Sequence, residues 1–134
     1  MTATDEGRGA LTAIDRRNGS IGRSNPVATD WSDRNVYWGE IHVQGYDSIG
    51  VGTPAEMFEW GRNAEGLDFC ATANHYGGRY DVTPEVWNRI VEASNAYYDP
   101  GEFVTFVSYE WGGGAAYGHR NVYYRGDEGT FFGP

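Results

Sequence analysis

Short apolar runs alternate with segments of helical pattern along most of this chain. The runs at residues 35–43, 67–73 and 103–109 have the length and composition of buried strands, and a helix signal follows each of the first two. Strands that alternate with helices favour parallel βαβ units over an antiparallel sandwich. We therefore expect an α/β fold in which these three strands run in the same direction. A further strand is expected at residues 118–126, after a glycine-rich loop.

Two helices are marked by their first residues. Thr53, Pro54 and Glu56 supply an N-cap, a first-turn proline and the glutamate of a capping box. Thr83 followed by Pro84 gives a similar signal for the second helix. We expect helices to begin at these two threonines.

The beginning of the chain has a different character. Residues 1–30 are polar and rich in Gly, Ser, Asn and Arg, with short apolar fragments only around Leu11 and Ile21. This segment is interpreted as a linker or as the end of a preceding segment. Residues 31–134 then form the α/β part of the chain.

Side chains that can bind a metal ion recur where successive strands are expected to end. The first strand ends in His42 and Gln44, the second in Asn74 and His75, and the third in Glu110. The carboxyl ends of parallel strands are where α/β barrels and open α/β sheets build their active sites. The pattern therefore predicts one shared site.

The first strand carries three polar side chains on one face. Alternation along an extended chain places Glu40, His42 and Gln44 on one side, because side chains repeat every second residue. Glu40 could then accept a hydrogen bond from an imidazole and orient it without touching a metal ion.

Most of these residues also have an ordinary structural explanation. A single histidine at a strand end, such as His42, is more often satisfied by the backbone than by an ion, and His75 could cap a loop. His119 and Arg120 could be solvated turn residues. Glu110 is harder to explain in this way, because a carboxylate beside an apolar strand must be paired or must bind a cation.

Charge and cysteine content exclude several classes of function. The net charge of −9 and the pI near 4.6 disfavour nucleic acids and anionic membranes as partners, since both are polyanions. The one cysteine, Cys70, lies in an apolar run, so neither a disulfide nor a cysteine zinc site is indicated. No stretch approaches the roughly 20 apolar residues of a membrane span. We expect no nucleic acid and no membrane partner.

Several motifs of the chain resemble the PHP (polymerase and histidinol phosphatase) superfamily of metal-dependent phosphoesterases. They are "VYWGEIHVQG", "GTPAEMFEWGRNAEGLDFCATANH", "DPGEFVTFVSYEWGG" and "GHRNVYY". More closely, they are similar to a PHP-like family of unknown function with the motifs W-G-D-L-H, G-T-P, G-L-D-F, P-G-x-F-V and Y-E-W. The resemblance covers about residues 35 to 125. Residues 23–27, "RSNPV", also look like the tail of the β-rich segment that precedes the barrel in that family, which would make residues 1–30 such a tail. The resemblance implies a distorted seven-stranded βα barrel that holds two or three divalent ions, usually manganese, iron or zinc.

The resemblance also implies roles for individual residues. His42 would match the first histidine of an H-x-H motif, and Gln44 stands where its second histidine would be. His75 would match the histidine of the second motif, and Glu110 a carboxylate that often bridges two ions. His119 would match a later ligand or a substrate contact.

Three departures from the family pattern affect the expected metal site. Gln44 replaces a histidine, Asn74 replaces the acid usual before the second-motif histidine, and Glu40 replaces an aspartate. At Gln44 and Asn74 a strong or charged ligand gives way to a neutral oxygen donor.

From these features we expect part of a metal-dependent hydrolase, phosphoesterase-like, that uses metal-activated water. The metal ligands would be His42, Gln44, His75 and Glu110, while His119 and Arg120 would contact a phosphorylated or otherwise anionic small molecule. Only about three βα units of a seven-stranded barrel are present, so the chain is interpreted as an amino-terminal fragment that is inactive alone. One alternative is a metal-poor relative that binds a ligand without hydrolysing it. Another is a structural domain whose polar strand ends only satisfy loops.

Overall fold

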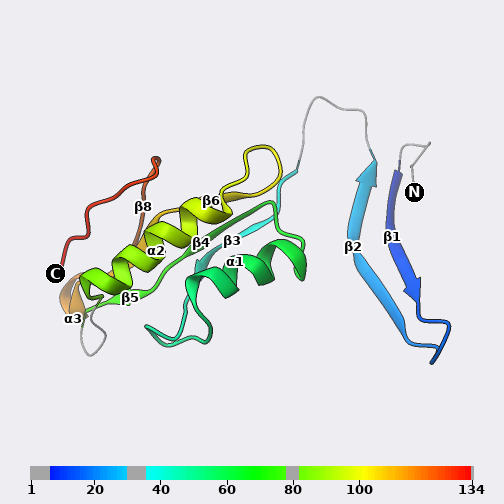
Figure 1. The fold of residues 1–134 in the computed structure, drawn as a ribbon, viewed down its shortest axis with the longest axis horizontal. Coiled ribbons are helices and arrows are strands. Elements are labelled where there is room, and N and C mark those ends of the chain that lie inside the picture. The colour runs from blue at the N-terminus through cyan, green and yellow to red at the C-terminus, as the bar shows by residue number, and fades with distance from the viewer. Residues whose placement is uncertain (1–6, 30–35, 78–81, 134) are drawn as a thin grey trace. The chain divides into compact units, whose positions relative to one another are not determined.

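The computed structural model describes residues 7–29, 36–77 and 82–133 (Figure 1). The chain forms two compact units, Met1–Val36 and Tyr37–Pro134. In the first unit, strands β1 (Gly7–Ile14) and β2 (Ile21–Thr29) pair antiparallel. The segment interpreted as a linker or a β-rich tail therefore contains a hairpin.

The second unit contains the parallel sheet that the alternation of strands and helices predicts. Strands β3 (Gly39–Val43), β4 (Phe69–Thr72) and β6 (Val104–Phe106) lie in the order β3-β4-β6, and both neighbouring pairs are parallel. Helix α1 (Pro54–Asn63) connects the first pair and helix α2 (Pro84–Tyr97) follows the second strand. Figure 1 shows the two helices side by side. The mixed α/β class is confirmed, although residue 35, where the first strand was expected to begin, lies outside the described residues.

Both helices begin at the predicted caps. The Thr53 hydroxyl accepts a hydrogen bond from the Glu56 amide at 3.1 Å, and the Glu56 carboxylate accepts one from the Thr53 amide at 2.7 Å. That second bond, made to the charged form, lowers the pKa of Glu56. Thr83 caps α2 by accepting from the amide of Val86. The capping box therefore fixes where α1 begins, directly after the loop that follows β3.

A second sheet contains three further strands. Strand β5 (His75–Tyr76) pairs parallel with β7 (Ser108–Gly112), and β7 pairs antiparallel with β8 (His119–Tyr123). The short helix α3 (Gly114–Tyr117) lies between β7 and β8. The strand expected within residues 118–126 is thus confirmed, and it runs antiparallel to its neighbour.

The expected single strand at residues 103–109 is wrong. It breaks at Val107, so that β6 joins the first sheet and β7 joins the second. Val107 is buried in the core, and its carbonyl accepts a hydrogen bond from the amide of Tyr124. The Ser108 hydroxyl bonds the carbonyl of Thr72, which satisfies a strand end where the two sheets diverge. Packing therefore divides a run that is continuous in its apolar character.

Two clusters of buried side chains support the sheets. One contains Val82, Val86, Trp87, Ile90, Val107 and Tyr109. The other contains Phe58, Cys70, Ala93 and Phe103. Helix α2 contributes to both, so it holds the two sheets in one unit.

The expected barrel is not seen as a closed structure. Within residues 7–29, 36–77 and 82–133, the strands form three separate sheets that close no barrel. In the same ranges, no helix has the length and apolar character needed to cross a bilayer.

Candidate functional site

Five of the side chains singled out in the sequence meet in one cluster, and they come from both sheets of the second unit. They are His42 on β3, Gln44 just after β3, His75 on β5, Glu110 on β7 and His119 on β8. Glu110 was expected at a strand end, but it lies in the middle of β7, opposite His75 on one side and Asn121 on the other. Packing of the two sheets brings the cluster together.

The Glu110 carboxylate is the centre of the cluster. Glu110 is only 4% exposed. Its Oε1 lies 2.7 Å from Nδ1 of His119. Its Oε2 accepts a hydrogen bond from Nε2 of Gln44 at 2.6 Å and lies 3.3 Å from Nε2 of His42. A carboxylate this buried requires such partners, because desolvation disfavours the charged form.

His75 and His119 face each other through their Nε2 atoms, which are 3.2 Å apart. Two imidazoles bound to one tetrahedral ion at about 2.0–2.1 Å place their nitrogens roughly 3.3 Å apart. Ligand atoms of His75, Glu110 and His119 all lie within 4.8 Å of one another. This spacing is that of side chains able to share one ion.

The carboxylate also orients one of these imidazoles. Because Nδ1 of His119 faces Oε1 of Glu110, a proton on Nδ1 leaves Nε2 as the lone-pair nitrogen, directed toward His75. The same relay from carboxylate to imidazole is common around bound zinc.

A glycine makes room for His75. A Cβ atom added to Gly112 would lie 2.6 Å from Nε2 of His75 and 2.7 Å from the carbonyl oxygen of Tyr76. Both distances are far shorter than a normal contact, so a side chain at residue 112 would displace the imidazole. Gly112 therefore shapes the cluster, and sequence reasoning missed it because "WGGGAA" resembles an ordinary flexible loop.

Ser48 joins Gln44 to the second sheet. Its hydroxyl oxygen accepts a hydrogen bond from the backbone amide of His75 at 3.0 Å and donates to Oε1 of Gln44 at 2.7 Å. The carboxamide oxygen of Gln44, expected to face a metal, is therefore occupied by Ser48, while its nitrogen faces Glu110. No sequence signal distinguished Ser48 from other loop serines.

Asn121 is a further residue that the sequence analysis missed. Its Nδ2 lies 3.1 Å from Nδ1 of His42. Asn121 follows His119 by two residues, so the alternation of β8 places both on one face, a signal that could have identified it. Glu40, expected as a partner for an imidazole, accepts a hydrogen bond from the backbone amide of His42 at 2.8 Å.

Two other candidates have different surroundings from those expected. Asn74 is fully buried, and its Oδ1 accepts a hydrogen bond from the Gly45 amide at 2.7 Å, so it supports the loop after β3. Arg120 is not brought into the cluster. It pairs with Trp111 across the sheet, on the face opposite Glu110, and its guanidinium donates to the carbonyl of His119.

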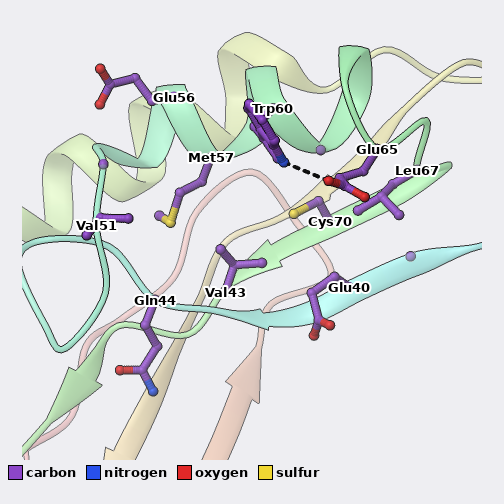
Figure 2. Close-up of a pocket in the computed structure, with 13 residues that line it drawn as sticks. Glu40, Val43, Gln44, Val51, Glu56, Met57, Trp60, Glu65, Leu67 and Cys70 are labelled. Carbon is purple, nitrogen blue, oxygen red and sulfur yellow. Dashed lines mark hydrogen bonds between the residues drawn. The ribbon is translucent and has the colours of Figure 1, made fainter. Parts of the chain in front are cut away.

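A large cavity lies beside the cluster, and Gln44 belongs both to the lining of the cavity and to the cluster. It has a volume of about 740 Å³ between α1 and β3, and its apolar lining includes Met57, Trp60 and Cys70. Figure 2 shows Val43 directed toward Met57 and Cys70, and Gln44 directed away from them. No histidine of the cluster is among the residues that line this cavity in the described part of the chain.

Burial dominates the chemistry of the one thiol in that cavity. It raises the pKa of Cys70 to about 11, with a smaller contribution in the same direction from the charge of Glu40. A thiol with so high a pKa is a poor nucleophile and a poor metal ligand at neutral pH.

Comparison with known proteins gives one match. The sequence model of a family described as "Protein of unknown function (DUF3604)" matches residues 55–131. No curated protein and no solved structure matches the chain. The matched range includes His75, Glu110 and His119, and it begins after His42 and Gln44.

Proposed function

The chain belongs to the DUF3604 family of proteins of unknown function, and from its own residues we propose that it is a metal-dependent hydrolase, phosphoesterase-like in its chemistry. The observation that carries the proposal is the placement of His75, Glu110 and His119 with their ligand atoms within 4.8 Å. Two imidazoles and a carboxylate suit zinc, iron or manganese.

The donor set fits such an ion for two reasons. The Nε2 atoms of His75 and His119 have the separation expected of two ligands on one ion, and Gly112 leaves the space that this arrangement needs. Glu110 supplies negative charge from a buried position, where it acts on a cation with little screening by water.

A divalent ion held there would lower the pKa of a water molecule and polarise a phosphoryl oxygen. The side chains of the cluster would contact the substrate and transfer a proton. His119 is 56% exposed and His42 47% exposed at the side chain, so a small anionic substrate can reach both. His42 lies within 3.3 Å of Glu110 Oε2, where its imidazole can hold or release a proton beside the reacting group.

The fold that we propose for the intact site is the PHP-type barrel. Its support is the parallel order β3-β4-β6 with helical connections, together with side chains of the cluster at the carboxyl end of β3. The motifs that resemble the PHP superfamily also support this proposal. In such a barrel the cluster would lie at the end where active sites are usually found.

A second candidate function is ligand binding without hydrolysis, in a metal-poor relative. It is favoured by the carboxamide of Gln44, which donates to Glu110 at a place where the related family has a histidine. In this case the cluster would bind an anion through the imidazoles of His42, His75 and His119.

Metal titration of the chelator-treated chain tests the proposal. We expect Zn²⁺ or Mn²⁺ to bind, His119→Ala to weaken binding by at least about 10- to 100-fold, and Arg120→Ala to leave it unchanged. Arg120 is the matched control, because it neighbours His119 in the chain and faces the other side of the sheet. Hydrolysis of p-nitrophenyl phosphate that depends on the added metal would support the enzyme reading. Equal metal binding by both variants would contradict the proposed site.

A further inference from the structure

The two oxygens of Glu110 have chemically different neighbours. Oε1 faces Nδ1 of His119, and the Nε2 atom of the same imidazole faces His75, where two lone pairs can converge on an ion. Oε2 faces the Nε2 amide group of Gln44 at 2.6 Å, with His42 at 3.3 Å. A carboxylate that bridges two ions needs lone-pair donors beyond both of its oxygens. The neighbour of Oε2 in Glu110 is instead an N–H donor, that of Gln44.

The orientation of the Gln44 carboxamide follows from its hydrogen bonds. The Ser48 hydroxyl accepts from the amide of His75, so its own hydrogen is free to donate, and it donates to Oε1 of Gln44 at 2.7 Å. The reversed carboxamide would place two acceptor oxygens 2.6 Å apart at Glu110. Ser48 and Glu110 therefore both favour the orientation in which nitrogen faces the carboxylate.

Charge gives an independent argument about the number of ions. Glu110 is the only carboxylate in the described cluster, and its other members, His42, Gln44, His75 and His119, are neutral when they act as ligands. Against the described side chains of this cluster alone, two divalent ions would leave a net charge of +3, whereas one ion leaves +1. An uncompensated charge of +3 in a partly buried site is strongly unfavourable.

We infer that the site in this chain holds one divalent ion between Nε2 of His75 and Nε2 of His119, with Glu110 behind His119 as its charge partner, and that Gln44 takes the place of a second ion at Oε2 of Glu110. The inference rests on the proposed metal site and concerns its stoichiometry. Gln44 is then a positioning residue. Its N–H holds one oxygen of the carboxylate, so that the other stays directed toward Nδ1 of His119 and orients the imidazole.

The experiment measures bound metal directly, without relying on turnover. The chelator-treated chain is equilibrated with Mn²⁺ by dialysis, the bound ion is counted per chain, and electron paramagnetic resonance shows whether two ions are coupled. We expect one uncoupled ion in the native chain. Gln44→Glu replaces the N–H donor by a second carboxylate, and we expect it to bind two ions. Ser48→Ala frees the carboxamide without adding charge, so it serves as the control and should still bind one.

Each outcome separates this inference from the proposed function. Two coupled ions in the native chain would overturn the inference and leave the metal-dependent function standing. One ion in both the native chain and a folded Gln44→Glu variant would overturn the role given to Gln44. No bound ion in the native chain would overturn the proposed function itself. If Gln44→Glu does not fold, the count in the native chain still decides between one ion and two.

Discussion

Replacing Glu110 by glutamine removes the charge of the cluster but keeps its shape. In the metal-free chain, the new carboxamide can accept from Nε2 of Gln44 and donate to Nδ1 of His119, so both close hydrogen bonds can re-form. The variant therefore separates the charge of Glu110 from its packing.

The expected change in stability without metal is small. Two charge-assisted bonds of about 1.5–3 kcal/mol become two neutral bonds of about 0.5–1.5 kcal/mol, a loss of roughly 2–3 kcal/mol. Burying the native carboxylate, which is 4% exposed, costs several kcal/mol of desolvation. The glutamine variant avoids this cost, and the saving offsets the weaker hydrogen bonds. We expect Glu110→Gln to change the free energy of unfolding by no more than about 2 kcal/mol in the presence of a chelator.

The expected change with metal is larger. At an ion concentration 100 times the native Kd, binding raises the free energy of unfolding by about 2.7 kcal/mol. If loss of the carboxylate weakens affinity by about 100-fold, the same ion concentration adds only about 0.4 kcal/mol.

Urea denaturation measures the free energy of unfolding with chelator and its increment with Zn²⁺ on the same samples. Glu92→Gln, which neutralises an exposed carboxylate on α2, is the control for net charge. The reasoning fails if Glu110→Gln loses more than about 4 kcal/mol without metal while the increment from Zn²⁺ stays near its native value. Glu110 would then be a structural centre and no part of a metal site.

Three further results are expected. Gly112→Ala should weaken metal binding by at least about 10-fold in a chelator competition, because its Cβ would lie 2.6 Å from Nε2 of His75; unchanged affinity would show that the imidazole is not held there. Ile90→Ala should lower the free energy of unfolding by about 2–5 kcal/mol in urea, because Ile90 is fully buried, and a loss below about 1 kcal/mol would count against the α2 core. Burial raises the pKa of Cys70 to about 11, so the thiol's contribution to stability is complete below about pH 9 and is lost as the pH rises toward 11. Unfolding of Cys70→Ala and of the native chain, compared across this pH range, measures that loss.

The helices were predictable because their signals are local. Thr53, Pro54 and Glu56 stand within one turn of each other, and the hydrogen bonds of a capping box join residues three apart. The same holds for Thr83 and Pro84. Such signals do not depend on how the rest of the chain packs.

The parallel direction of β3, β4 and β6 was also predictable, since a strand followed by a helix returns most easily to a parallel neighbour. The convergence of His42, His75 and Glu110 was expected from that direction, and the structure does bring them together. Their use as metal ligands remains a prediction.

Only the tertiary structure decided which sheet each strand joins. The sequence shows one apolar run at residues 103–109, but its division at Val107 depends on a buried side chain and on hydrogen bonds to Thr72 and Tyr124. The placement of Glu110 in the middle of β7 follows from that division. No residue pattern near Val107 predicts the break between β6 and β7.

The finer features of the cluster were decided in the same way. Ser48 reaches Gln44 and His75, and Gly112 leaves room for His75, through contacts between residues far apart in the chain. Hydrogen bonds and steric clearance act over a few ångströms in space, whatever the separation in sequence. The sequence by itself therefore determined the helices, the class of fold and most of the candidate residues. The tertiary structure decided which atoms of those residues face one another.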